Sequence, residues 1–346
     1  MFFKNLTFYL AFLLVVSGFF FENHAQNSTA RFLLWQPSAR SNAMGGTGTA
    51  FHDNAYAAYY NPAILAFSPD INLVGSVVKP VPTFGNIVHS FFAGNVNLKG
   101  FGALGLSANL FWMGNQYFTH ISSVDSKSFN WQAKISYARK VKQHFAFGAS
   151  LSILKYNLSD FKISVGGSRG DGLTSTVLAD FGLMACNILP SLTISNSGIK
   201  IKPILRKWAD VKDRKGISIG LSLLNYGSKI VFVNEELKDN PPTLLSLGTN
   251  YWILNDQGLS VLLAIDFEKQ VHESSTLDYI HFGGEINFFH MFAFRSGYYL
   301  DTFSPKTSFF TIGMGFHTRY FSFNLARYKR TLLPSWQFDG TISLEI

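Results

Sequence analysis

The feature that most constrains this chain is the regular alternation of apolar and polar residues in its last eleven positions. Trp336, Phe338, Ile342, Leu344 and Ile346 share one face of an extended segment, and mostly polar residues occupy the other. Side chains of a β-strand alternate between two faces, so the pattern predicts a strand with one apolar and one polar side. A final strand of this kind that ends on an apolar residue is typical of an outer-membrane β-barrel. Taken alone, the segment would also suit a strand of a soluble sandwich.

The same alternation recurs along the chain from about residue 73. Most of the segments that show it approach the length of a membrane-spanning β-strand, roughly nine to eleven residues. We therefore predict an all-β fold, a transmembrane antiparallel β-barrel of about 14 strands. The predicted strands span residues 73–79, 88–98, 100–112, 129–139, 144–157, 173–186, 216–224, 243–253, 258–267, 278–288, 290–300, 307–317, 320–328 and 336–346.

The predicted connections alternate in length. Tight turns at 99–100, 141–143, 255–258, 289–290 and 318–319 alternate with longer polar loops at 114–128, 158–172, 228–242, 269–277 and 329–335. Outer-membrane barrels have short periplasmic turns and longer extracellular loops. Residues 187–215 break this alternation, because a long connection there falls on the periplasmic side. It contains a candidate extra hairpin, which would raise the strand count to sixteen.

The chain begins with the pattern of a secretory signal peptide. Lys4 precedes an apolar core at 6–21, and Ala25 offers a small residue at a cleavage site before Gln26. The core is too short to span a bilayer comfortably, and no later apolar run reaches about 18 residues. We predict export, cleavage after residue 25 and localisation in the outer membrane. Cys186 is the single cysteine, which excludes a disulfide framework.

Composition argues against an ordinary soluble domain. Aromatic residues make up 16% of the chain and charged residues only 14%, against about a quarter charged in soluble domains. In a barrel, an aromatic outer surface would face lipid, which matches it. The net charge of +8 could suit nucleic acid, but an exported chain rarely meets any. We therefore predict outer-membrane lipid, lipopolysaccharide and periplasmic partners, and no nucleic acid.

The residues before the first strand differ from the rest. Small residues dominate, and Asp53 and Asn61 have the pattern of helix N-caps, with Pro62 directly after Asn61. Such a segment could pack inside a lumen as a hatch. We therefore divide the chain into a signal peptide (1–25), an N-terminal hatch segment (26–70) and a transmembrane barrel (71–346). The residues expected to hold or gate the hatch are Arg40, Gly45, Gly46, Asp53, Asn61 and Pro62.

The hatch segment also carries the motifs of a known family. Ala39-Arg-Ser41, Met44-Gly-Gly46, Asp53-Asn54 and Tyr60-Asn-Pro-Ala63 resemble the N-terminal signature of the PorV/PorQ family, a branch of the FadL/TodX-like outer-membrane barrels. The resemblance continues at 225–230, 241–248 and 292–298, and the glycine usual after Asn-Pro-Ala is Ile64 here.

The resemblance implies a fourteen-stranded barrel with an N-terminal hatch, from a Bacteroidetes-type bacterium. It also implies a part in type IX secretion, in which such barrels receive exported proteins that carry a C-terminal signal domain. The implied partners are those secreted proteins or other type IX secretion components. The main alternative is a FadL-like passive transporter of hydrophobic small molecules, and a weaker one is an outer-membrane lipid hydrolase.

Four carboxylates lie on the polar faces of predicted strands. If the apolar rows face lipid, Asp180, Asp266, Glu268 and Glu285 point into the lumen, because a charge on the lipid face near the membrane centre costs up to about a few kcal/mol. We expect them to pair with cations such as Lys134, Lys155 or Arg295 and brace the lumen, or else to line a substrate path.

Catalytic motifs are weak in this sequence. Residues 216–220 match the Gly-x-Ser-x-Gly elbow of hydrolases, but that motif requires a strand-to-helix turn, and Ser218 lies inside an alternating strand. The histidines show no metal-ligand spacing. The glycine-rich residues 44–49 follow no strand and contain no lysine, unlike a phosphate-binding loop. We predict no enzyme, with no catalytic residue, metal or cofactor.

Overall fold

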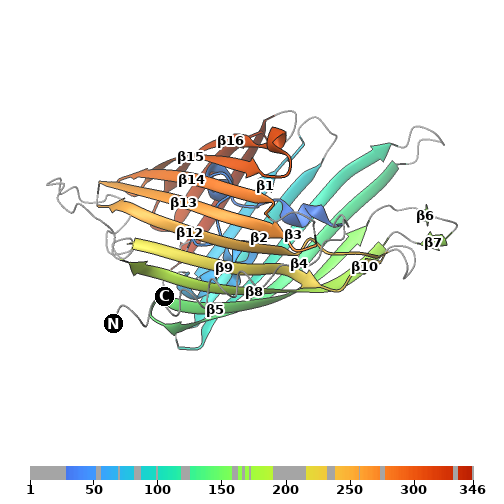
Figure 1. Cartoon of the computed structure of the whole chain (residues 1–346), viewed down its shortest axis with the longest axis horizontal. Helices are drawn as coiled ribbons and strands as arrows, with labels where there is room; N and C mark the ends of the chain where they lie inside the picture. The colour runs from blue at the N-terminus through green and yellow to red at the C-terminus, as the bar shows by residue number, and fades with distance from the viewer. Residues whose placement is uncertain are drawn as a thin grey trace.

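The dominant feature of the computed structural model is a closed antiparallel β-barrel (Figure 1). The structure describes residues 29–51, 56–68, 71–81, 87–98, 100–117, 125–157, 163–165, 168–170, 173–189, 216–231, 238–256, 258–272, 277–329 and 334–344. The predicted signal peptide, Asp53 and the candidate hairpin in 190–215 lie outside these residues. Within them, none of the helices is both long and apolar enough to cross a membrane.

Fourteen strands form the barrel, as the sequence predicts. Each predicted segment corresponds to one strand, and most bounds differ by only a few residues. The barrel strands are β1 (Ile71–Val78), β2 (Val88–Leu98), β3 (Gly102–Tyr117), β4 (Asp125–Lys142), β5 (Phe145–Asn157), β8 (Leu173–Leu189), β9 (Gly216–Gly227), β12 (Leu244–Asn255), β13 (Leu259–Gln270), β14 (Tyr279–Phe288), β15 (Phe292–Asp301), β16 (Phe309–His317), β17 (Phe321–Tyr328) and β18 (Ser335–Leu344).

The first and last strands close the barrel. β1 pairs with β18 along its whole length, from Ile71 opposite Leu344 to Val78 opposite Gln337. Every other strand pairs with its neighbours in the chain order of the barrel. Closure satisfies the backbone hydrogen bonds of all the strands, which a structure that crosses a membrane with strands requires.

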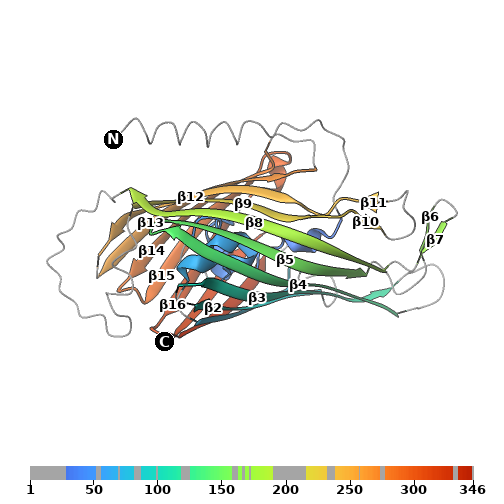
Figure 2. The same cartoon turned by 90° about the horizontal axis from the view of Figure 1, so that it is seen from below.

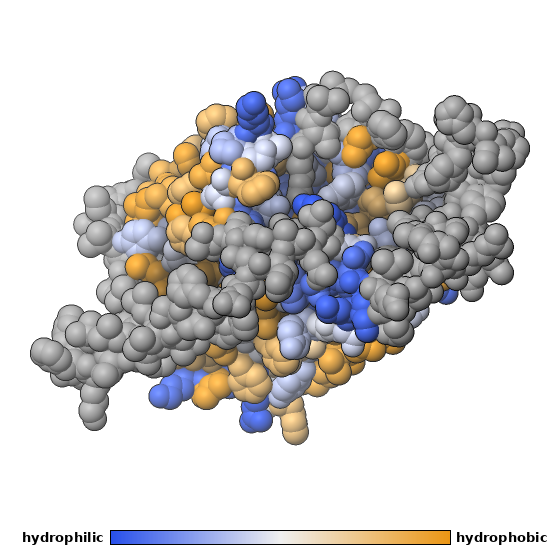
Figure 3. All heavy atoms as spheres, turned by 45° about the vertical axis from the view of Figure 1, so that its right-hand side comes forward, coloured by the Kyte–Doolittle hydropathy of each residue, from blue (hydrophilic) through white to orange (hydrophobic). Residues whose placement is uncertain are grey.

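Burial follows the alternation of the sequence. In β5 the residues alternate between exposed and buried along nearly the whole strand. Outward positions carry large apolar side chains such as Leu151, which is 60% exposed, and Phe338, which is also 60% exposed. Orange, apolar side chains accordingly cover much of the outer wall visible in Figure 3. The inward positions are largely polar, and they are buried because the lumen is filled.

The connections differ in part from the prediction. β3 and β4 extend into the predicted 114–128 loop and pair there, from Asn115 opposite Lys127 to Tyr117 opposite Asp125. Two short hairpins lie within the next two predicted loops: β6 (Ile163–Val165) with β7 (Ser168–Gly170), and β10 (Ile230–Val231) with β11 (Lys238–Asp239). The longer connections cluster at one end of the barrel, here called the loop end, and most short ones at the other, the turn end (Figures 1 and 2).

The residues before β1 fill the lumen. Residues 29–51 and 56–68, here called the luminal segment, form the short helices η1 (Arg31–Leu34), α2 (Ala39–Ala43), α3 (Ala57–Tyr60) and η2 (Pro62–Phe67). In both ribbon views these helices, coloured blue, lie inside the barrel. The segment starts at the loop end, where the Thr29 amide donates to the Asn240 carbonyl at 3.2 Å. It ends near the turn end, where Leu65 contacts Gly105.

Candidate functional site: the filled lumen

A buried ion-pair network holds α2 to the barrel wall. Both nitrogens Nε and Nη2 of Arg40 donate to the Glu285 carboxylate on β14, each at 2.8 Å. Arg295 on β15 donates to the same carboxylate at 2.5 Å. Glu285 and Arg295 are only 2% and 4% exposed. Losing one partner would leave a buried charge uncompensated, which typically costs about 3–5 kcal/mol.

The network continues around the wall to β18. Arg295 donates to the Asn324 side chain at 2.8 Å, and Asn324 donates to Asp339 at 2.7 Å. The other oxygen of Asp339 accepts from the Ala39 amide at the first turn of α2, at 2.6 Å. Thus α2 is bound at its first turn by Asp339 and through the Arg40 side chain by Glu285. Sequence reasoning did not select Asp339, although its polar position on the last strand placed it on the luminal face.

A second set of contacts holds the glycine-rich turn after α2. Asp266 on β13 accepts from the backbone amides of Gly48 and Thr49, at 2.8 and 2.9 Å. Thr311 on β16 accepts from the Gly45 amide at 2.9 Å and donates to the Ala43 carbonyl at 2.9 Å. Wall side chains therefore satisfy backbone groups that the internal hydrogen bonds of the turn, such as that from the Gly46 amide to the Ser41 carbonyl, leave over.

His281 connects this turn to Glu268. Its Nδ1 lies 2.7 Å from the Gly45 carbonyl oxygen. Because a carbonyl only accepts, Nδ1 carries the proton. Its Nε2 lies 3.1 Å from the Glu268 carboxylate, within ion-pair distance but without hydrogen-bond alignment. In the pairing of β13 with β14, Glu268 lies opposite Tyr279 and Glu285 opposite Leu262, so the two carboxylates face different parts of the lumen.

The fourth predicted carboxylate, Asp180, lies on another part of the wall. It forms a 2.5 Å ion pair with Lys134, whose ammonium also donates to the Ala58 carbonyl at 3.2 Å. Asp180 sits at a β-bulge between β8 and β9 and accepts from the Asn225 amide at 2.7 Å. The suggestion that Lys155 pairs with a luminal carboxylate is wrong, because its side chain lies on the exposed outer face of β5.

Asn61 and Pro62 start the helix η2, as the sequence predicts. The Asn61 side chain accepts from the Ala63 amide at 3.0 Å, and Pro62 occupies the first turn. The amide of Asn61 also donates to the carbonyls of Thr49 and Leu183, at 3.1 and 3.0 Å. One side chain therefore caps a helix and ties it both to the glycine-rich turn and to β8.

Glycines of the wall let the luminal backbone touch the barrel directly. A Cβ on Gly297 would lie 2.1 Å from the Gly45 amide nitrogen, and one on Gly220 would lie 2.1 Å from the Thr49 carbonyl oxygen. Several of these glycines face one another across neighbouring strands, such as Gly283 opposite Gly297. The wall glycines at which an added Cβ would meet luminal backbone are Gly148, Gly182, Gly220, Gly283 and Gly297, and at Gly248 and Gly313 it would meet the Cβ atoms of Thr49 and Ala43. Isolated glycines inside strand patterns signal close backbone approach, and sequence reasoning overlooked that signal.

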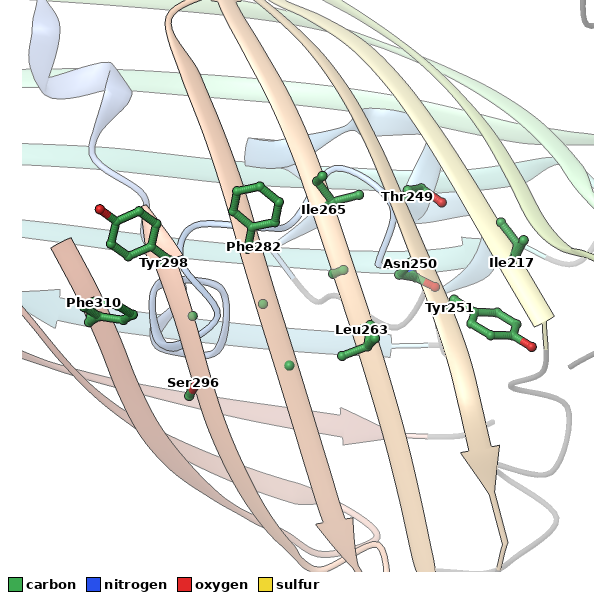
Figure 4. Close-up of a pocket in the computed structure, with 14 residues that line it drawn as sticks. Ile217, Thr249, Asn250, Tyr251, Leu263, Ile265, Phe282, Ser296, Tyr298 and Phe310 are labelled. Carbon is green, nitrogen blue, oxygen red and sulfur yellow. The ribbon is translucent and has the colours of Figure 1, made fainter. Parts of the chain in front are cut away.

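Two spaces adjoin the luminal segment. A cavity of about 20 Å³ lies beside Glu268, between Gln36 of the luminal segment and Tyr279 and Tyr299 of the wall. On the outer face, an apolar groove of about 750 Å³ crosses β9 and β12 to β16 (Figure 4). Its floor includes Gly283, Gly284 and Gly297, so only backbone separates this part of the groove from the glycine-rich turn inside.

The candidate catalytic groups are not brought together. Ser218 is buried on β9, and its hydroxyl accepts from the Asn187 amide at 3.2 Å. His281 contacts Gly45 and Glu268, and His290 lies near the carbonyl of Asp256 at the turn end. Among the described residues, no group of three or more His, Cys, Asp or Glu side chains is placed to hold a metal ion.

Comparisons with known proteins identify the kind of barrel. Residues 21–185 match the family described as type IX secretion system protein PorV. No curated protein matches the chain. The CymD monoaromatic hydrocarbon channel is similar in structure, with 14% identity, 90% of this chain and 98% of that chain covered, and a TM-score of 0.55. The Pseudomonas putida toluene transporter TodX has 14% identity and a TM-score of 0.53, with 92% of this chain and 98% of that chain covered. The Ralstonia pickettii toluene transporter TbuX has 16% identity and a TM-score of 0.52, with 88% of this chain and 96% of that chain covered.

The predicted resemblance to PorV is therefore confirmed over residues 21–185. At identities of 14–16% the structural neighbours show the fold, which is that of the TbuX, TodX and CymD barrels. The chain is an outer-membrane β-barrel. Its loop end is extracellular and its turn end periplasmic, because outer-membrane barrels place their longer loops outside.

Proposed function

We propose that this outer-membrane barrel takes part in type IX protein secretion, by docking secreted proteins or other secretion components at the outer membrane. The observation that carries the proposal is the match of residues 21–185 to PorV. That segment includes the luminal segment and strands β1 to β5, and the helix η2 packs against β4 and β5 within it.

The filled lumen supports docking rather than conduction. The luminal segment is bound by the Arg40–Glu285 and Lys134–Asp180 groups and lies directly against the wall glycines. The cavity beside Glu268, about 20 Å³, has room for one water molecule. By comparison, an apolar cavity of roughly 150 Å³ binds benzene. A barrel whose interior is occupied in this way offers its rims and outer wall to partners.

The experiment that tests this proposal is quantitative proteomics of medium, cell surface and periplasm after deletion of the gene in its host. We expect proteins with C-terminal secretion domains to leave the surface and accumulate in the periplasm, and the wild-type gene in trans to reverse this. Unchanged distributions in the deletion strain would reject the secretion role.

A second candidate function is passive transport of hydrophobic small molecules. The groove on the outer face favours it, because this groove lies over the glycine-floored wall opposite the glycine-rich turn. The structural neighbours named as toluene transporters share the fold. Against it, β14 and β15 remain paired across the groove floor, from Gly283 opposite Gly297 to Gly284 opposite Ser296, so the wall has no opening there.

Uptake measurements separate the two functions. Transport would require that cells lacking the gene take up toluene more slowly than wild-type cells, with the distribution of secreted proteins unchanged. The secretion role predicts unchanged toluene uptake and an altered distribution of secreted proteins. If the barrel serves secretion, Arg40, Gly45, Gly46, Asn61 and Pro62 hold the lumen closed and do not gate a path.

A further inference from the structure

Trp336 stands on the outer wall near the extracellular rim, next to a cation. It occupies the outward face of β18 and is 51% exposed. Arg327 lies directly opposite on β17, with its guanidinium carbon 5.5 Å from the centroid of the Trp336 ring. The pair is held together by a cation–π contact on a surface that faces the membrane.

Two further cations surround the same tryptophan. Lys79 directly follows Val78, the last residue of β1, which pairs with Gln337, so Lys79 lies just past the end of β1, next to the part of β18 that carries Trp336. Lys329 lies two residues beyond Arg327 and shares its outward face. Both lysines are exposed. Neighbouring strands are about 4.8 Å apart, so the backbones of Lys79 and Arg327 are separated by about 10 Å, with Trp336 between them.

This group marks the outer boundary of the apolar band. Toward the membrane centre, the same strands expose Phe338 (60%), Phe323 (59%) and Leu73 (51%). The outward faces of β1, β17 and β18 carry no carboxylate among the described residues, because Asp339, the acidic residue of these strands, is buried inside. The cations therefore lie at the depth of lipid headgroups and face no protein anion on their own strands.

We propose that Lys79, Arg327, Lys329 and Trp336 form a binding site for the phosphate groups of lipopolysaccharide. Arginine binds phosphate with two parallel hydrogen bonds, and lysines add positive charge. A tryptophan at this depth packs its ring along the boundary between sugar and acyl chains. The site lies at the extracellular end, so it meets the outer leaflet, where the phosphorylated lipid is lipopolysaccharide. The proposal rests on the outer-membrane location and is independent of the secretion role.

Binding of purified lipopolysaccharide to the detergent-solubilised barrel tests the site. The chain is compared with the triple variant Lys79→Gln, Arg327→Gln, Lys329→Gln by native mass spectrometry across a lipopolysaccharide titration. We expect at least tenfold weaker binding for the variant, and a similar loss when the wild-type chain meets dephosphorylated lipopolysaccharide. The matched control is Arg139→Gln, which removes an exposed outward cation at the turn end and should leave binding unchanged.

Several outcomes would overturn the site. Equal binding by the triple variant, equal loss in the Arg139→Gln control, or undiminished binding of dephosphorylated lipopolysaccharide would each reject it. Binding of phosphatidylglycerol as tight as that of lipopolysaccharide would show a general anionic-lipid surface instead. The heat-dependent shift of the barrel in gel electrophoresis reports folding. Should the triple variant fail to fold, Lys79→Gln alone serves, because Lys79 lies outside the strand pairing.

Discussion

At the scale of single residues, the lumen is held by contacts that tolerate little change. Gly45 has φ of +72° and lies against β14 and β15, where its amide meets the Thr311 hydroxyl. Glu285 receives hydrogen bonds from Arg40 of the luminal segment and Arg295 of the wall. The contact at Gly45 depends on the backbone conformation, and the contact at Glu285 depends on the balance of charges. Different substitutions therefore test the two residues.

A methyl group at position 45 should loosen the luminal segment. In Gly45→Ala, the new Cβ would lie 2.4 Å from the Phe282 carbonyl oxygen, and alanine at positive φ adds about 1–2 kcal/mol of strain. Gly100→Ala is the matched control, since Gly100 has φ of +89° and no atom within 4 Å of the new Cβ. We expect Gly45→Ala to lower the midpoint of thermal unfolding in detergent clearly more than Gly100→Ala. Equal shifts would mean that the backbone contact contributes nothing.

Removing the charge of Glu285 should destabilise the barrel strongly. Glu285→Gln leaves Arg40 and Arg295 close together without their anion, which should cost about 3–5 kcal/mol of unfolding free energy. The double variant Arg40→Gln, Glu285→Gln removes one of the two cations and should recover part of this loss. Urea unfolding of the barrel in lipid vesicles measures the unfolding free energy of the single and of the double variant. A double variant less stable than Glu285→Gln would contradict the charge argument, and the exposed Lys306→Gln should change nothing.

At the scale of elements, the short helices of the luminal segment are stabilised mainly by the wall. None exceeds six residues, so none would persist alone in water. Ser38 is the N-cap of α2, and its hydroxyl accepts from the Ser41 amide at 3.3 Å. Asn61 is the N-cap of η2. Of the two caps, only the Asn61 side chain also donates to carbonyls of a distant turn and of a strand.

Asn61→Ala should therefore cost more than Ser38→Ala. Loss of a cap alone costs about 0.5–2 kcal/mol, and Asn61→Ala additionally leaves two buried carbonyls without their donor. We expect limited proteolysis of the barrel in detergent to cut the luminal segment of Asn61→Ala faster than that of Ser38→Ala. Equal cleavage rates would show that the contacts of Asn61 with Thr49 and Leu183 are dispensable.

At the scale of the whole molecule, the luminal segment crosses the barrel from end to end. Thr29 contacts Asn240 at the extracellular end, and the chain passes the middle of the wall at Gly45 before it reaches the turn end at Leu65. The barrel strands then begin from the periplasmic side at Ile71. The early residues of the segment therefore lie at the outer mouth of the barrel.

Labelling of intact cells tests this path. In a Cys186→Ser background, Thr29→Cys should react with a membrane-impermeant maleimide on intact cells, because Thr29 is partly exposed at the loop end. Lys142→Cys, at the exposed periplasmic end of β4, should react only after the outer membrane is permeabilised. Labelling of Thr29→Cys only after permeabilisation would reverse the direction of the segment.

The barrel architecture could be predicted from the sequence. Period-two alternation, repeated at membrane length, predicted about fourteen strands and the luminal side of carboxylates such as Glu285, because a charge on the lipid face costs free energy. It did not predict the side of every residue, since Lys155 faces outward. The cap at Asn61 and Pro62 was also readable, since it depends on neighbouring residues only. The tertiary structure decided which groups meet inside: Arg40 with Glu285, the Ala39 amide with Asp339, and Gly45 with Gly297. Residues hundreds of positions apart come together only when the barrel closes, and local patterns do not encode such contacts.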